Sequence, residues 1–189
     1  MLMQLNAAAQ SKSGIENYNF LSSKEAYVWV PVVHHVNKKG IYTEMRYNYE
    51  GIKTASLYAG KSFSKKGLLN YTITPMLGIV VGKFNGGSFA TNADIEYKKI
   101  LASVQTQYTI SSNAVKDDFF FNWTEIAFKP LKWFYAGLSM QQTKLYSTVL
   151  KSEYGILAGF VLQKFTIPIY VFNPFSKNKN FIIGINTEW

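Results

Sequence analysis

Several residue types that carry chemistry in proteins are missing or scarce in this 189-residue sequence, which has no cysteine, two histidines and a single arginine. Without cysteine the chain can form no disulfide, no zinc–thiolate or iron–sulfur centre and no cysteine nucleophile. No apolar run reaches the ~20 residues that a membrane-spanning helix requires, so a helical membrane protein is excluded. We expect no metal site and no cofactor.

What the sequence does contain is apolar and basic. Hydrophobic residues make up 48% of the chain and aromatic residues 16%, which is ample apolar surface for a fold and excludes a disordered chain. The formal net charge is +9, nearly all of it from lysine, often in pairs such as Lys38-Lys39 and Lys98-Lys99. Because these lysines are not interleaved with aromatic residues and arginine is almost absent, the sequence does not favour nucleic-acid binding.

A period of two dominates from Tyr27 to the C-terminus. In the segment IYTEMRYNYE (41–50), one face carries Ile, Thr, Met, Tyr and Tyr, whereas the other carries Tyr, Glu, Arg, Asn and Glu. Such alternation over ~10 residues predicts a strand with one apolar face. Strands are expected at 15–21, 26–36, 41–50, 53–63, 68–83, 88–98, 100–111, 119–128, 133–143, 153–163, 166–172 and 180–189. In 119–128 Asn122 and Thr124 share one parity and Glu125 has the other, which predicts a β-bulge there.

Evenly spaced alternating strands fit two architectures. A soluble lipocalin-like carrier would turn the apolar faces inward, whereas a membrane barrel turns them to the lipid. The second faces of several strands carry small and polar residues, and aromatic residues gather near strand ends, where membrane girdles lie. We therefore predict an all-β fold, an antiparallel up-and-down transmembrane β-barrel of about twelve strands, with ten as the alternative. The soluble carrier remains the other possibility.

The chain ends in FIIGINTEW (181–189), with Phe181, Ile183, Ile185 and Trp189 on one face. In this it resembles bacterial outer-membrane β-barrels, whose last strand typically closes with Phe or Trp as an assembly signal. Through EMRYNYE (44–50) and FFNW (120–123) it is also similar, more loosely, to uncharacterised small barrels of Bacteroidota-type envelopes. The resemblance implies a bacterial outer-membrane location, with outer-membrane lipids, lipopolysaccharide and the barrel-assembly machinery as partners. It names no activity.

Domain organisation is expected to be simple. Residues 1–14, with small residues at 7–9, are interpreted as a signal-peptide remnant or a flexible tail, and residues 15–189 as one barrel domain. With Trp189 on the periplasmic side, the longer connections 112–118, 145–152 and 173–179 fall outside. The turns 37–40, 64–67, 98–99, 129–132 and 163–165 fall inside.

The candidate site is the lumen. Arg46 shares its face with neighbouring carboxylates, and charges inside a barrel must be paired or wet. The candidate lumen and selectivity residues are Glu44, Arg46, Asn48, Glu50, Asp94, Glu96 and Glu125. They would form either an ion-pair network that fills the barrel or a polar constriction that selects small solutes.

These two arrangements of the lumen predict two functions, namely a narrow passive channel for small solutes or a filled structural barrel. The alternative from another class is an outer-membrane hydrolase acting on lipid or lipopolysaccharide. Its weak candidate base is His35, which shares a strand face with Tyr27 and Trp29 and lies beside an inner turn. The sequence contains no G-x-S-x-G motif to support that alternative.

Overall fold

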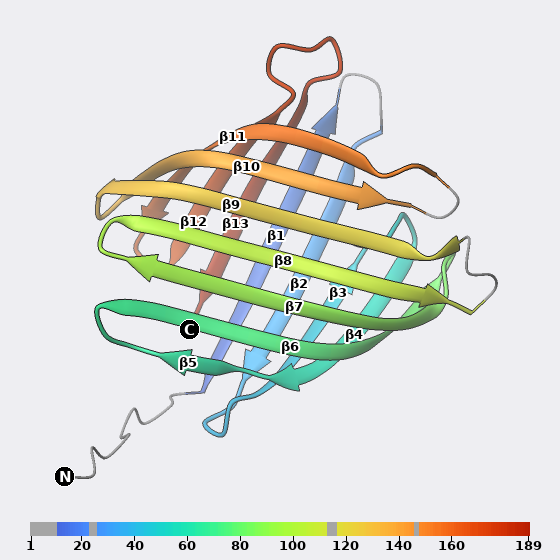
Figure 1. The fold of residues 1–189 in the computed structure, drawn as a ribbon, viewed down its shortest axis with the longest axis horizontal. Coiled ribbons are helices and arrows are strands. Elements are labelled where there is room, and N and C mark those ends of the chain that lie inside the picture. The colour runs from blue at the N-terminus through green and yellow to red at the C-terminus, as the bar shows by residue number, and fades with distance from the viewer. Residues whose placement is uncertain (1–10, 23–25, 113–116, 146–147) are drawn as a thin grey trace.

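The computed structural model describes residues 11–22, 26–112, 117–145 and 148–189, and these are almost entirely β-structure (Figure 1). Most of the segment 1–14, interpreted above as a signal remnant or tail, lies outside the described residues. The strands are β1 (Lys12–Ser22), β2 (Val28–Val36), β3 (Ile41–Tyr47), β4 (Thr54–Lys61), β5 (Phe63–Lys65), β6 (Leu69–Gly82), β7 (Gly86–Tyr97), β8 (Ile100–Ser111), β9 (Phe119–Leu131), β10 (Phe134–Lys144), β11 (Lys151–Leu162), β12 (Phe165–Phe172) and β13 (Asn180–Glu188). None of the described residues forms a helix long and apolar enough to cross a membrane.

The sheet closes on itself. Apart from β4 and β5, strands that are neighbours in the chain pair antiparallel, and β1 pairs with β13, so the first and last strands lie side by side. β5 continues β4 after a break at Ser62, and both segments pair with the long strand β6. The thirteen segments therefore form a twelve-stranded barrel, as predicted, with walls that cross at an angle in Figure 1.

The two ends of the barrel differ in their connections. The end that carries the N-terminal part of β1 and the C-terminus has the short turns, for example Lys98-Lys99 between β7 and β8. The opposite end carries the longer connections, including 112–118 and 173–179. This is the arrangement predicted from the sequence, and it gathers the lysine pairs of the short turns at the end with the termini.

The apolar faces of the strands point outward. Met45 on β3 and Leu138 on β10 are each 62% exposed, and large apolar side chains on the other walls are exposed in the same way. A continuous apolar surface around a closed barrel requires a lipid environment, since water would penalise it. The apolar faces of the strands are thus oriented as in a membrane barrel, and not as in a soluble carrier.

Strand β9 departs from one expectation. It pairs with β8 without interruption, and its only register shift lies opposite Phe134 and Ala136, beside Lys129 and Pro130, outside the segment 119–128. Asn122 and Thr124 face outward, where the Asn122 amide donates to Thr124 Oγ1 at 3.1 Å. The predicted bulge is therefore in the wrong place. Side-chain hydrogen bonding, and not a change of register, accommodates these polar residues on the outer wall.

Candidate functional site: the barrel interior

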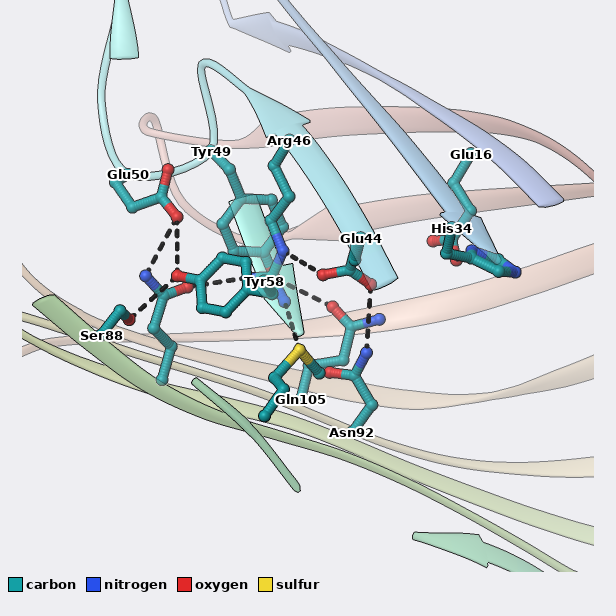
Figure 2. Close-up of polar contacts among 12 residues, drawn as sticks. Glu16, His34, Glu44, Arg46, Tyr49, Glu50, Tyr58, Ser88, Asn92 and Gln105 are labelled. Atoms are coloured by element: carbon teal, nitrogen blue, oxygen red, sulfur yellow. Dashed lines mark hydrogen bonds and ion pairs between the residues drawn. The ribbon is translucent and has the colours of Figure 1, made fainter. Parts of the chain in front are cut away.

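Arg46 lies at the centre of a polar network inside the barrel. On β3 it pairs with Glu44, two residues away on the same face, and both side chains are buried. Across the interior, Arg46 donates from Nη1 to Gln107 Oε1 on β8 at 2.7 Å. Its guanidinium carbon lies 4.3 Å and 4.5 Å from the ring centres of Tyr49 and Tyr58. Figure 2 shows Arg46 enclosed by these groups.

Glu50 extends the network toward the end with the long connections. It follows β3 in the tight turn to β4 and is fully buried. Its Oε1 accepts hydrogen bonds from Tyr58 Oη at 3.1 Å and from Gln107 Nε2 at 3.0 Å, whereas its Oε2 has no partner within the described residues. Tyr58 also bonds to Ser88 on β7 (Figure 2). The network therefore ties β3 and β4 to β7 and β8 across the lumen.

An aromatic cluster inside the barrel joins β9 to β12 and β1. Trp123 on β9 packs against Tyr170 on β12, with ring centres 4.9 Å apart, and against Tyr18 on β1 at 5.3 Å. Phe121 contacts Tyr49 edge-on at 5.2 Å. Because Tyr49 also contacts Arg46 and donates to Gln105 Oε1 at 2.9 Å, it joins the aromatic cluster to the polar network. Side chains thus bridge the barrel at the level of Arg46.

Inward-facing glycines do not leave the free space that small residues suggest. Gly78 on β6 pairs with Tyr58, and a Cβ at Gly78 would lie 2.4 Å from that ring. Gly159 on β11 likewise lies beneath the ring of Tyr135 on β10. At such a position the aromatic ring of the cross-strand neighbour packs over the glycine and fills the space that a side chain there would occupy.

Acidic side chains dominate the half of the interior near the termini. These carboxylates, on inward positions of β1, β7, β9 and β13, are Glu16, Asp94, Glu96, Glu125 and Glu188. His34 on β2 lies between two of them, with Nδ1 3.6 Å from Glu16 Oε1 and Nε2 3.8 Å from Glu188 Oε1. No group of three metal-ligating side chains occurs in the part of the chain that the structure describes.

The predicted site residues divide into three places. Glu44, Arg46 and Glu50 meet in one network, and Asp94, Glu96 and Glu125 face the acidic half. Asn48 is a turn residue with φ of 58°, and its side chain bonds to Trp29 O and Lys53 N at the end with the long connections. These hydrogen bonds stabilise the turn. Because Asn48 lies beyond the end of β3, it does not continue the inner face of that strand.

His35 faces outward. It does share a face with Tyr27 and Trp29, but that face is the outer wall, and the inward histidine is His34. His35 Nδ1 lies 2.9 Å from Ser13 Oγ near the end with the termini. Among the described residues, no carboxylate is joined to this pair by a hydrogen bond.

Asp118 fastens the connection between β8 and β9. Its carboxylate accepts from Tyr108 Oη at 2.5 Å and from the Ser111 amide at 2.9 Å. The hydrogen bond from Tyr108 and that from Ser111 hold the pKa of Asp118 below its usual value. Sequence reasoning did not single out this residue. The only signal available was its position directly before an aromatic strand.

Sequence reasoning also missed Tyr49, Gln107, Trp123 and Gln141, which build much of the interior. Tyr49 stood with the outward residues of segment 41–50, but the chain turns after Tyr47 and redirects its ring inward. The parity of β9 could have placed Trp123 beside Glu125 on the inner face.

Comparisons with known proteins agree with this geometry. No family model and no curated protein matches the chain. Among solved structures, a KdgM porin aligns with a TM-score of 0.66 at 10% identity, covering 92% of this chain and 98% of that one. A KdgM porin in complex with disordered oligogalacturonate gives the same values. The fold is that of a bacterial outer-membrane β-barrel.

A further structural match, Omp33 of Acinetobacter baumannii, covers 96% of this chain and 99% of that one at 9% identity, with a TM-score of 0.48. At such identities the likeness concerns the fold. Together with the apolar outer wall, the KdgM match supports an outer-membrane location. It leaves the narrower resemblance to Bacteroidota-type barrels as a prediction.

Proposed function

We propose that this protein is a narrow outer-membrane channel for small solutes, whose constriction is the polar network around Arg46. The observation that carries the proposal is the set of contacts that crosses the lumen, from Glu44 and Arg46 on β3 to Gln107 on β8. Polar and charged groups that line a constriction select solutes by charge and hydrogen bonding. A barrel filled only by hydrophobic packing would not require such charged and polar side chains inside.

The charge of the interior favours cations over anions. Most of the chain's eleven acidic residues face inward, whereas the lysines lie mainly in the turns. A lumen lined by one sign of charge raises the local concentration of the opposite ion. On this ground the solutes of this barrel differ from the oligogalacturonate of the KdgM complex, because a polyanion would meet Asp94, Glu125 and Glu50.

Bilayer recordings test the proposal. The refolded protein should give discrete conductance steps, and a potassium chloride gradient should give a reversal potential of the sign for cation preference. Asp94→Asn should reduce that preference, whereas Lys65→Gln, at the exposed last residue of β5 near the end with the termini, should change it little. Discrete steps with anion preference would contradict the charge argument.

A filled structural barrel is the second candidate, favoured by the contact between Tyr49 and Phe121 that joins the two walls. The variant Phe121→Ala removes one side of that contact. If neither the parent protein nor this variant gives conductance steps after correct insertion, the channel proposal fails and the structural role replaces it.

Two finer proposals accompany both candidates. Lysines in the short turns, such as Lys98 and Lys99, are suited to anionic head groups of lipids or lipopolysaccharide. The C-terminal face of Phe181, Ile183, Ile185 and Trp189 is proposed as the signal for the barrel-assembly machinery. The stretches EMRYNYE and FFNW support an origin in a Bacteroidota-type envelope. These proposals rest on the sequence pattern and on the position of the segments at the barrel ends.

A further inference from the structure

A cavity lies inside the barrel at the end with the long connections. It has a volume of about 260 Å³, it is partly open, and residues of the turn after β3, such as Asn48, Gly51 and Ile52, contribute to its lining. Its wall is rich in aromatic side chains, including Tyr18, Tyr49, Phe119, Phe121, Trp123 and Phe172. The volume is slightly below the range of roughly 300–1,000 Å³ of small-molecule sites, so the cavity suits one small ring and not a long chain.

Two residues of the cavity lining each have one buried polar atom that lacks a partner within the described residues. Gln141 on β10 is 7% exposed, and its amide Nε2 makes no hydrogen bond. Glu50 is fully buried, and its Oε2 has no donor, although Oε1 has two. A buried polar atom without a partner is costly, which makes an unmet donor and an unmet acceptor in one cavity wall informative.

The register places one of these atoms beside the largest ring. Gln141 is the direct cross-strand partner of Trp123, so the amide and the indole are neighbours on the cavity wall. Trp123 itself is satisfied, because its Nε1 donates to Ser139 Oγ at 2.8 Å. The indole therefore contributes apolar ring surface to the cavity lining, and Gln141 has the unpaired donor next to it.

Chemistry decides among possible ligands. An anion is disfavoured by the carboxylate of Glu50, and a simple cation leaves the Gln141 donor unpaired. A hydroxyl group both donates and accepts, so the hydroxyl groups of a polyhydroxylated ring match both the acceptor on Glu50 and the donor on Gln141. The C–H face of such a ring is apolar and can pack against aromatic side chains. Near the rim, Lys151 lies 3.1 Å from Glu153 and balances its charge.

We propose that this outer cavity is a binding site for one unit of a neutral saccharide, held by Trp123 and the neighbouring rings, Gln141 and Glu50. The site goes beyond the proposed channel, because binding requires only that a sugar reach the open end of the barrel. A sugar that binds would occupy the path directly above the Arg46 network, since Glu50 belongs to both.

Calorimetric titration of the refolded protein in a detergent without a sugar head group tests the site. The probes are maltotriose, trigalacturonate as the anionic counterpart and tetramethylammonium chloride as the cation. Saturable binding of maltotriose that exceeds the other two supports the proposal. Tighter binding of trigalacturonate or tetramethylammonium overturns it, as does the absence of saturable maltotriose binding.

The chain offers a matched pair of glutamines as a control. Gln141 faces the cavity, whereas its neighbour Gln142 lies on the outer wall, where it contacts Asn122 and Ser152. Gln141→Leu should weaken maltotriose binding about tenfold, the worth of a hydrogen bond, whereas Gln142→Leu should leave it unchanged. Equal effects of both variants would overturn the proposal.

If Gln141→Leu does not refold, Gln141→Glu removes the amide donor within nearly the same shape and should cause a similar loss. Unchanged maltotriose affinity in that variant would also refute the site. Conductance is measured separately, so a silent barrel that binds maltotriose would refute the channel and leave this site standing.

Discussion

Replacing Arg46 with methionine tests whether the interior network is dry and structural. The variant Arg46→Met retains a long aliphatic side chain but loses the ion pair with Glu44, the 2.7 Å hydrogen bond to Gln107 and two contacts with aromatic rings. It leaves the buried carboxylates of Glu44 and Glu50 without their nearest cation. Breaking a buried ion pair from one side costs about 3–5 kcal/mol, so we expect a loss of that size in the free energy of unfolding.

A double-mutant cycle isolates the pair. Glu44→Gln alone should also destabilise the barrel, whereas Glu44→Gln with Arg46→Met removes both charges and should recover about 2–3 kcal/mol relative to the sum of the single variants. The assay is urea unfolding of the protein in phospholipid vesicles, followed by tryptophan fluorescence. Glu96→Gln, at an exposed position near the end with the termini, serves as the control and should have little effect.

The outcome that would refute this reasoning is a small one. Ion pairs in contact with water contribute about 0–1 kcal/mol. If Arg46→Met costs no more than that, water fills the lumen at this level and the contacts do not bridge the barrel. The channel would then be wider than the structure indicates, and the charge of Arg46 would act mainly on passing ions.

Two further predictions concern the barrel wall and its closure. Gly159→Ala should lower the free energy of unfolding by about 1–3 kcal/mol, because the new Cβ would lie 2.0 Å from Tyr135 Cζ, whereas Gly87→Ala, with nothing within 4 Å, should leave stability unchanged in the same urea assay. Equal effects would refute the pairing of ring and glycine. Trp189→Ala should slow assembly in cells yet preserve stability in vesicles, because the two 2.9 Å backbone hydrogen bonds between residue 189 and Ser13 remain. Deletion of Trp189 should reduce both the assembly rate and the stability. Normal assembly of the alanine variant in cells would argue against an assembly signal at this residue.

The strand pattern could be read from the sequence because one periodicity carries it. Lipid on one side of the wall and a polar lumen on the other impose the alternation of the twelve segments. Their antiparallel order then determines at which end of the barrel each turn lies. The ends of the strands do not follow from this periodicity alone. The expected strand 41–50 ends at Tyr47, since the positive φ of Asn48 and the turn that follows send Tyr49 and Glu50 back into the lumen.

The candidate site could be predicted only in part. Parity along single strands correctly grouped Glu44 with Arg46, but it could not indicate which strands face one another across a closed barrel. The contact from Arg46 to Gln107 joins residues 61 positions apart and depends on closure through β4 and β6. Parity also cannot decide which of His34 and His35 faces the lumen, because two adjacent identical residues give no difference in hydropathy. The aromatic neighbours on β2 decided that choice in the structure, with Trp29 outside.

The division of the interior into an acidic half near the termini and an aromatic half near the long connections has a consequence for any solute that crosses. A neutral ring entering beside Trp123 exchanges water for aromatic contact, whereas further progress requires it to pass Arg46 and then a region of carboxylates. A cation meets the opposite order of costs, because it gains little at the aromatic half and most at Glu125 and Asp94. Binding of neutral sugars and conduction of cations would therefore be separable properties of one barrel, and sugar in the outer cavity would reduce cation current without sharing its path through the acidic half.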